Sequence, residues 1–313
     1  MRRGYFSEGR QWLDTMLALP GAESYPAPYA AALFTAGMLA YLQGNYAPAR
    51  QQLEASLAQR RALGDTAGVV LAINNLALVA RDQGDYATAS ALFEEALALN
   101  QARADRRATA LSLHNLSLTH LDQGVYNQAR PLLEQALALF RSLGDQRSLG
   151  LSLLSLGIAL YHLDDLPQAG QRLAESLALL EDLKDRWGAA VAHKNLALVT
   201  LKQGQVDEAR ASLQTSLAAF REMEERSGVA ECLQGYAALA CAQSQPYAAA
   251  WLLAASQALL DGMGAVMVPA DRADFDAQLA LVRAALPPED FAAAWASGRA
   301  ASLEAMVEAT RRV

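Results

Sequence analysis

The sequence predicts an all-α fold built from stacked pairs of antiparallel helices. Three observations lead to this prediction: the composition, a repeat of 40 residues, and turn and capping residues at fixed places in that repeat. Alanine and leucine dominate the apolar residues, and aromatic residues make up only 7% of the 313 residues. Because aromatic and β-branched residues favour strands, their scarcity favours helices.

A pattern that recurs every 40 residues covers most of the chain. The turn Gly44-Asn45-Tyr46 returns at residues 84–86 and 124–126, and more weakly at 164–166 and 204–206. Five residues after each turn there is an alanine: Ala49, Ala89, Ala129, Ala169, Ala209 and Ala249. A leucine or phenylalanine follows four residues later: Leu53, Phe93, Leu133, Leu173, Leu213 and Leu253. A fixed period of this length is typical of repeat architectures.

Each repeat is expected to form one helix hairpin. Apolar residues at helical spacing lie on both sides of the turn, and a glycine there suits the left-handed conformation that ends a helix. Small residues, expected where two backbones approach closely, lie seven residues before the turn: Gly37, Ala77, Ser117, Gly157, Ala197 and Ala237. Aspartates expected to cap the first helices recur as well: Asp65, Asp105, Asp145 and Asp185. With Glu225, which recurs at the same place, they also suit the helix dipole. One hairpin cannot bury its apolar face alone, so successive hairpins should stack.

This combination of residues resembles the tetratricopeptide repeat (TPR), whose usual unit is ~34 residues. The alanine five residues after the turn and an alanine or serine seven residues further on carry the resemblance. The longer unit, with Asn-Leu-Ala in its first helix, resembles the repeats of kinesin light chains and of MalT-like bacterial regulators. The resemblance implies a right-handed α-solenoid, the TPR superhelix, over residues 28–262, with about six 40-residue units. Asp164 and Ser244 depart from the pattern because they replace the turn glycine.

The two ends of the chain differ from the repeats. In residues 1–27, Gly4 corresponds to Gly44 and Leu13 to Leu53, which predicts the second helix of a truncated or partial repeat. Phe6, Leu13 and Leu17 would then be partly uncovered. We expect the chain to be cut from a longer protein, or a partner domain to cover this end; a degenerate amphipathic cap is the alternative.

Residues 263–313 break the period and are expected to form a C-terminal helical cap, with helices over 271–286, 291–298 and 302–311. Phe291 and Trp295 would cover the last repeat. The segment resembles the tail that closes the repeat region of large LuxR-type bacterial regulators. That resemblance implies DNA-binding and ATPase domains upstream that are missing from this chain.

Composition excludes several classes of protein. The formal net charge of −7 argues against direct nucleic-acid binding by this segment. The only two cysteines, Cys232 and Cys241, are too few for a disulfide framework and favour a reduced, cytoplasmic setting. Charged residues interrupt the N-terminal segment, and polar residues interrupt the longest uncharged stretch, residues 232–260. We therefore expect no signal peptide and no membrane association.

No residue pattern points to catalysis. The sequence has neither a P-loop motif nor a dinucleotide-binding glycine motif, and the four histidines lack the spacing of a metal site. No Ser-His-Asp or Cys-His arrangement can be argued from the sequence. We expect a protein that is not an enzyme and that needs no metal and no cofactor.

The first helices carry the candidate binding residues, because the first helices of TPR arrays line a concave groove. In the family, an asparagine there often hydrogen-bonds the backbone of a bound extended peptide, which by resemblance points to Asn75, Asn115 and Asn195. The alternative is that these amides bond neighbouring helices. Three further sets of residues complete the candidate site. The positions directly before these asparagines in the repeat are Asn74, His114 and Lys194, and the positions four residues further on form an apolar column of Leu78, Leu118, Ile158 and Leu198. Arg81 and Tyr161 would lie at the rim of the groove, with His162 and Lys202 nearby.

The sequence thus predicts a non-catalytic scaffold that binds a protein or peptide segment in its groove. More narrowly, it predicts the sensor or regulatory region of a larger bacterial signalling or transcriptional regulator. A stand-alone TPR adaptor or oligomerisation module is the alternative. The apolar column suits a hydrophobic or amphipathic segment. Lys194 favours a ligand with carboxylates, whereas Asp82 and Asp122 oppose one.

Overall fold

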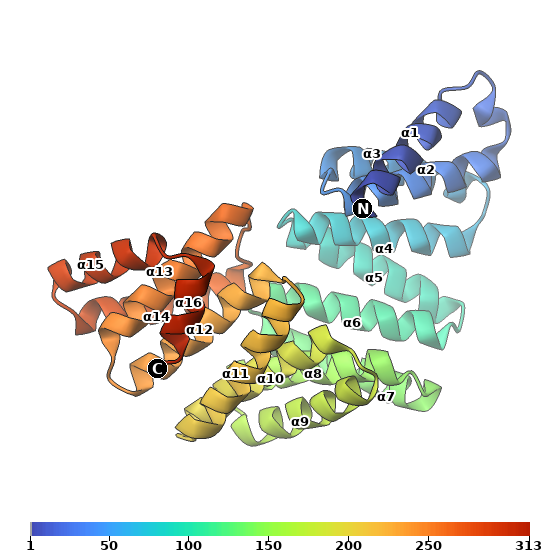
Figure 1. The fold of residues 1–313 in the computed structure, drawn as a ribbon. Coiled ribbons are helices and arrows are strands. Elements are labelled where there is room, and N and C mark those ends of the chain that lie inside the picture. The colour runs from blue at the N-terminus through green and yellow to red at the C-terminus, as the bar shows by residue number, and fades with distance from the viewer. Residues whose placement is uncertain (1) are drawn as a thin grey trace. The chain divides into compact units, whose positions relative to one another are not determined.

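The computed structural model describes residues 2–313, with side chains from Ser7 onward, so the exposure of Phe6 lies outside the described residues. In this part the chain forms sixteen α-helices and one short 3-10 helix (Figure 1). Consecutive helices pack as hairpins, which confirms the predicted all-α solenoid of the TPR type.

Each repeat contributes two helices of 17 or 18 residues. The first helices are α2 Pro26–Leu42, α4 Thr66–Asp82, α6 Arg106–Asp122, α8 Gln146–His162, α10 Arg186–Lys202 and α12 Arg226–Ala242. The second helices are α3 Tyr46–Ala62, α5 Tyr86–Ala102, α7 Tyr126–Leu143, α9 Leu166–Asp182, α11 Val206–Glu222 and α13 Pro246–Met263. The remaining elements are α1 Arg2–Leu17, η1 Ala22–Ser24, α14 Pro269–Ala285, α15 Pro288–Arg299 and α16 Leu303–Thr310.

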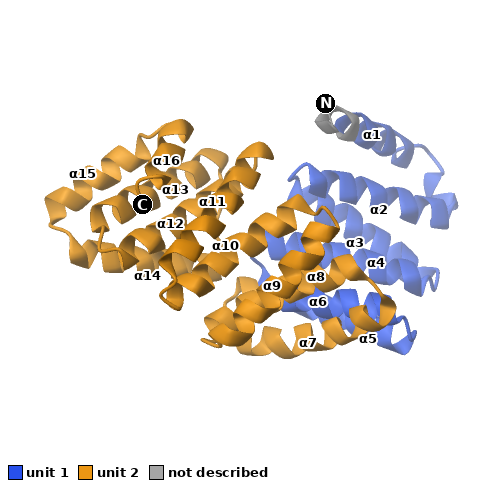
Figure 2. Cartoon of the chain, turned by 60° about the horizontal axis from the view of Figure 1, so that its bottom comes forward, with its two compact units in different colours: residues 1–119 blue, residues 120–313 orange. Residues whose placement is uncertain are grey.

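The chain divides into two compact units, residues 1–119 and residues 120–313 (Figure 2). The boundary falls inside α6. In unit 1, α2 packs on α3 and α4 packs on α5. In unit 2, the pairs are α8 with α9, α10 with α11, and α12 with α13.

The repeat columns lie in the cores of the two units, as the sequence predicts. The alanines from Ala49 to Ala249 are 0% exposed, and the leucines and phenylalanine that follow them are at most 1% exposed. Small residues permit this packing: a methyl group built on Gly157 would lie 2.5 Å from Cγ of Leu173. The columns therefore mark the places where the two helices of a hairpin touch.

Serine hydroxyls tie several hairpins together inside the core. The Ser56 hydroxyl donates to the Ala30 carbonyl at 2.7 Å, and the Ser176 hydroxyl donates to the Gly150 carbonyl at the same distance. The Ser216 hydroxyl makes the equivalent bond to the Ala190 carbonyl at 2.8 Å. Each bond joins a second helix to the first helix 26 residues earlier, so a buried polar group is satisfied at a repeated place.

Both turns of the repeat use the left-handed backbone conformation, including those without glycine. At the turn inside the hairpin, Asp164 has φ 61° and Ser244 has φ 57°, so they keep the geometry of the glycine that they replace. The turn between hairpins does the same at Ala104, with φ 53°. The remaining turns of this second kind have positive φ at Gly64, Gly144, Lys184, Glu224 and Gly264.

The predicted caps of the first helices are confirmed. Asp65 accepts a hydrogen bond from the backbone N–H of Gly68 at 2.9 Å, and Asp105 accepts one from Ala108 at 3.0 Å. Asp145 and Asp185 cap α8 and α10 in the same way. Glu225 also caps α12, but it accepts from the backbone N–H of Ser227, two residues later. Asp85 and Asp165 also cap second helices, which the repeat pattern did not indicate.

The N-terminal helix α1 packs on α2 and leaves much of its surface open. Leu13 and Leu17 are half-buried. Trp12 is 66% exposed and Met16 is 55% exposed. Both large apolar side chains therefore lie on the uncovered side of α1.

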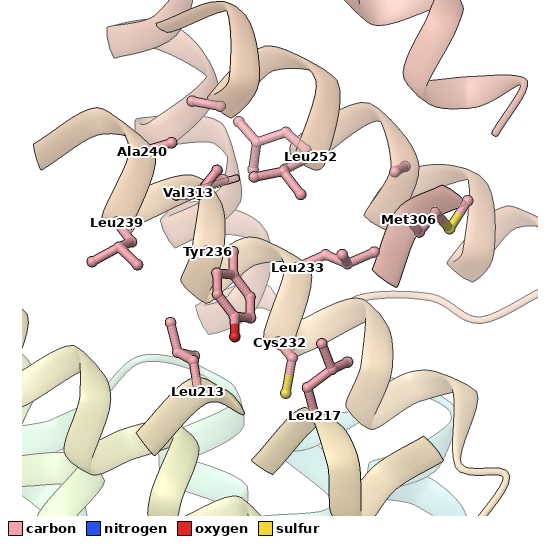
Figure 3. Packing of buried hydrophobic residues seen from close by; sticks show 14 of the residues in the cluster. Leu213, Leu217, Cys232, Leu233, Tyr236, Leu239, Ala240, Leu252, Met306 and Val313 are labelled. Atoms are coloured by element: carbon pink, nitrogen blue, oxygen red, sulfur yellow. The ribbon is translucent and has the colours of Figure 1, made fainter. Parts of the chain in front are cut away.

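The C-terminal helices pack onto the last hairpin of unit 2. Helix α15 approaches α13 so closely that a methyl group on Gly298 would clash with the Trp251 backbone oxygen. Val313 is buried, and the Arg210 guanidinium donates to its backbone oxygen at 2.9 and 3.1 Å. Figure 3 shows Val313 in one apolar cluster with Tyr236 of α12. Phe291 and Trp295 pack against the same cluster.

Replacing Leu133 by alanine tests the predicted core register. Because Leu133 is 0% exposed, the substitution should lower the free energy of unfolding by about 2–5 kcal/mol. Chemical denaturation followed by helical circular dichroism measures this. Leu143→Ala, at a position 40% exposed in the same helix, is the matched control and should cost well below ~1 kcal/mol. Equal effects of the two substitutions would contradict the register.

Replacing Ala104 by glycine tests the left-handed turn between hairpins. A left-handed conformation costs an L-residue roughly 1–2 kcal/mol, and part of the relief is offset by the greater chain entropy of glycine. The substitution should therefore raise the free energy of unfolding by about 0.5–1 kcal/mol in the same assay. The reciprocal change Gly64→Ala, at the equivalent turn, should lower it. A destabilising Ala104→Gly would show that this turn lacks the assigned conformation.

Candidate functional site

The predicted apolar column lies at the edge of the cores and not inside them. Leu78 and Leu118 in unit 1 are half-buried, as are Ile158 and Leu198 in unit 2. Each side chain thus packs on one side and leaves apolar area accessible on the other. In each unit, the first helices therefore leave apolar surface accessible.

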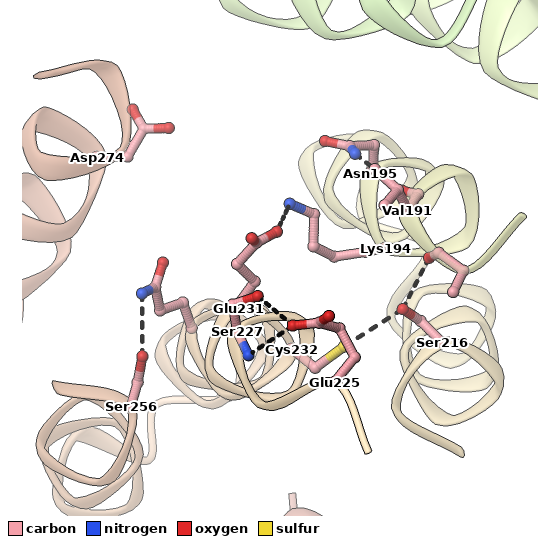
Figure 4. Close-up of polar contacts among 12 residues, drawn as sticks. Val191, Lys194, Asn195, Ser216, Glu225, Ser227, Glu231, Cys232, Ser256 and Asp274 are labelled. Carbon is pink, nitrogen blue, oxygen red and sulfur yellow. Dashed lines mark hydrogen bonds and ion pairs between the residues drawn. The ribbon is translucent and has the colours of Figure 1, made fainter. Parts of the chain in front are cut away.

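Two of the three candidate asparagines, Asn75 and Asn195, use one of their amide N–H groups within their own helix. Asn75 donates to the Leu71 carbonyl at 2.8 Å. Asn195 donates to the Val191 carbonyl at the same distance (Figure 4). Asn75 and Asn115 are half-buried, and Asn195 is 8% exposed. The bonds of Asn75 and Asn195 go to the same helix and not to a neighbouring one. Each amide keeps a second N–H donor and its oxygen for other partners.

In unit 1, the neighbouring positions on the first helices are a buried amide, Asn74, and a histidine, His114. The side-chain oxygen of Asn74 is buried and has no hydrogen-bond partner among the described residues. Burial, with a further contribution from the charge of Arg81, lowers the pKa of His114 to about 4. His114 is therefore neutral at neutral pH.

In unit 2, the adjacent register carries a lysine that is already paired. Lys194 is 17% exposed, and its Nζ atom lies 2.7 Å from a carboxylate oxygen of Glu231 on α12 (Figure 4). Burial alone would lower the pKa of Lys194, but the charge and hydrogen bond of Glu231 together with the charge of Asp271 outweigh this, so the pKa is raised. Lys194 thus stays charged.

Aromatic side chains and a second lysine lie on α7, α8 and α10. The rings of Tyr126 and His162 stack with centroids 4.2 Å apart, and Tyr161 meets His162 edge-on at 5.0 Å. The Nζ atom of Lys202 lies 4.2 Å from the Tyr161 ring centroid and 3.6 Å from a carboxylate oxygen of Asp164. A cation over an aromatic face is attracted by the ring.

We call the surface formed by Tyr126, Tyr161, His162, Lys194 and Lys202 the lysine face of unit 2. Burial raises the pKa of Tyr161 to about 12. Burial, together with the charges of both lysines, lowers the pKa of His162 to about 4. The two lysines are therefore the positive charges of this face at neutral pH.

The first two turns of α14 lie against the lysine face, and sequence reasoning missed this contact. A carboxylate oxygen of Asp274 lies 3.7 Å from Nε2 of His162, and Asp271 interacts electrostatically with Lys194. A methyl group built on Gly124 would lie 4.0 Å from Cβ of Ala270. The tail lies outside the repeat period, so the sequence carries no register from which this contact could be read.

The candidate residues are distributed over both units. Unit 1 holds Asn74, Asn75, Leu78, Arg81, His114, Asn115 and Leu118; unit 2 holds Ile158, Tyr161, Lys194, Asn195 and Leu198. Within residues 2–313, no group of three or more histidine, cysteine or acidic side chains could hold a metal ion. Cys232 and Cys241 are free thiols. None of the helices described here combines the length and apolar character needed to cross a membrane.

Comparison with known families gives one match. Residues 68–142 and 107–182 each match the tetratricopeptide repeat. The two overlapping segments contain the predicted turns at residues 84 and 124 and the variant turn at 164. A search of curated protein sequences found no match.

Solved structures of low sequence identity share the fold. The apo form of RapI is 13% identical, with a TM-score of 0.62, and the match covers 82% of this chain and 97% of RapI. A Rap protein complexed with competence and sporulation factor is 14% identical, with a TM-score of 0.58, and the match covers 92% of this chain and 86% of the Rap protein.

A kinesin light chain-like structure is also similar. It is a putative kinesin light chain from Podosopora anserina with nearly identical TPR-like repeats. It is 18% identical, with a TM-score of 0.52, and the match covers 62% of this chain and 95% of that one. The matched segments, the buried columns and these structures agree: residues 68–182 match tetratricopeptide repeats, and the chain has the fold of this repeat.

Proposed function

We propose that the chain is a non-catalytic scaffold that binds a protein or peptide segment on the accessible face of its first helices. The observation that carries this proposal is the position of Asn75, Asn115 and Asn195, which occur at the same place in the 40-residue repeat. An amide offers both a donor and an acceptor, so it can bond the backbone of a ligand whatever its side chains. The apolar columns beside these amides would add contact area for an amphipathic segment.

The fold supports the same proposal. A Rap protein of this fold was crystallised with competence and sporulation factor. By analogy, we propose that the ligand of this chain is a protein or peptide factor. The described residues provide no cluster of convergent metal-binding groups, and the histidines His114 and His162 on the first helices are held neutral. We therefore propose a binding role without catalysis.

We further propose that the chain is the sensor or regulatory region of a larger bacterial signalling or transcriptional regulator, acting in the cytoplasm. This rests on the resemblance of the long repeats and of the tail to such regulators. A stand-alone adaptor or oligomerisation module is the second candidate. The reading frame around the gene separates the two, because upstream codons for a P-loop ATPase domain would support the first and an immediate natural stop codon would exclude it.

Replacing Asn75, Asn115 and Asn195 together by alanine tests the binding role. We expect the triple variant to capture its partner at least about tenfold less, because each lost amide bond contributes about 0.5–1.5 kcal/mol. A quantitative pull-down from extract of the cells that express the protein measures this capture. Helical circular dichroism and the thermal midpoint should stay close to those of the unaltered protein.

A matched control replaces three exposed amides outside this register, Asn45, Asn127 and Gln203, by alanine. The control variant should capture the partner as well as the unaltered protein does. Loss of helicity in the test variant would assign the three asparagines to fold stability. Undiminished capture by a folded test variant would overturn their binding role.

A further inference from the structure

A cavity lies between three helices at the C-terminal end of unit 2. Its volume is about 430 Å³, within the ~300–1,000 Å³ that is usual for small-molecule sites. Its wall includes Ala248, Trp251 and Leu252 of α13, Ser297 of α15 and Ala305 of α16. None of these residues belongs to the candidate site on the first helices. The cavity is therefore a separate feature of the fold.

Small side chains leave this space open. Ala305 and Ala309, which are four residues apart in α16, both line the cavity, as does Ala248 of α13. Helix α16 is nonetheless firmly seated, because Met306 and Val307, which lie between the two alanines, are buried. The cavity thus results from the small side chains of its wall and not from poor packing of the helix.

The aromatic part of the wall is held in place. The Nε1–H group of Trp251 donates to the Ser297 hydroxyl at 3.1 Å, which joins α13 to α15. Gly298 permits this close approach, because a methyl group there would clash with the Trp251 backbone oxygen. Tyr247 also lines the cavity and is 47% exposed. A flat apolar group that enters the cavity would meet a fixed indole ring and an accessible phenol ring.

The lining carries one positive charge that is not balanced within the protein. Glu308 lines the cavity, but a guanidinium nitrogen of Arg311 lies 2.8 Å from its carboxylate and balances its charge. Arg312 lines the cavity as well, and it forms no ion pair with any residue from Ser7 onward. A guanidinium binds a carboxylate through charge-assisted hydrogen bonds. The cavity therefore favours an anionic ligand.

The backbone on both sides of Arg312 is anchored. Thr310 is 3% exposed, and its hydroxyl donates to the Val307 carbonyl at 2.7 Å. Val313 is buried in the apolar cluster of Figure 3, and its backbone oxygen accepts two hydrogen bonds from Arg210. The fold thus sets the position of Arg312 before any ligand binds, which lowers the entropic cost of binding.

We propose that this cavity binds a small molecule that combines a flat apolar ring with a carboxylate. The ring packs against Trp251, and the carboxylate pairs with Arg312. This site goes beyond the proposed function, because it lies on the C-terminal helices and takes a different class of ligand. Since its walls come from α13, α15 and α16, a bound ligand would stabilise the packing of these helices on one another.

Titration of the 313-residue chain with indole-3-acetate and with indole-3-acetamide tests this proposal. The two probes share the ring and differ in charge. The indole N–H signal of Trp251, assigned with the Trp251→Phe variant, reports binding in NMR spectra of the isotope-labelled chain. The Kd of the acetate should be at least about fivefold lower than that of the acetamide, because charge-assisted hydrogen bonds are the stronger ones. The signals of Trp12 and Trp187, which do not line the cavity, should not move.

Two variants and one control locate the ligand. Arg312→Gln should abolish the preference for the acetate and leave binding of the acetamide almost unchanged. Arg221→Gln removes the same charge from an exposed position outside the cavity and should keep the preference. Ala305→Leu enlarges a side chain of the wall and should weaken both probes at least about tenfold, because the ligand would have to displace that side chain. The thermal midpoint of each variant shows whether it is folded.

Three results would overturn the proposal. Equal Kd values of the two probes for the unaltered chain, or equal loss of the preference in Arg312→Gln and Arg221→Gln, would remove the role of Arg312. A Trp251 signal that moves with neither probe, or undiminished binding to a folded Ala305→Leu chain, would show that the cavity is not the site. Partner capture by the asparagine variant is measured separately, so the binding role of the first helices stands or falls independently.

Discussion

Close approach of two helices at small residues is the constraint on which the structure depends. Each second helix buries an alanine and a larger apolar residue four positions later, and the facing first helix must be small at the same level. At Gly157 the space is filled by Leu173, so that even one methyl group would overlap with it. Since interiors are close-packed, this fit fixes how the two helices of a hairpin lie against each other. The turns, caps and serine bonds then hold the ends of helices whose packing is already determined.

The repeat columns and the caps could be predicted from sequence because they recur at a fixed step. Asp65 and Asp105 cap their helices as expected, and the variant turn at Asp164 keeps the left-handed geometry. The left-handed turn at Ala104 could not be predicted, because alanine gives no signal of positive φ and the conformation is imposed by the packed helices on either side. At such positions tertiary packing, and not the conformational preference of the residue, determines the backbone conformation.

The candidate site was only partly accessible to sequence reasoning. The registers identified side chains that the structure leaves half-buried on the first helices, such as Leu78, Tyr161 and Lys194. They did not indicate that the side-chain amides of Asn75 and Asn195 donate to carbonyls of their own helices, because a side-chain rotamer depends on the atoms packed around it. The contact between α14 and the lysine face could not be predicted for another reason. The C-terminal segment does not follow the 40-residue repeat, so nothing in its spacing relates Asp274 to His162.

The hydrogen bond from Ser56 to the Ala30 carbonyl, with its equivalents at Ser176 and Ser216, has a consequence for how such a gene can change length. Every one of these bonds is internal to a single 40-residue module. A duplication or loss of one whole module therefore leaves no orphaned hydroxyl and no mismatched column at the new junction. Recombination between equivalent codons can lengthen or shorten the array in whole steps, whereas an insertion of any other length inside a helix would misalign both partners at once.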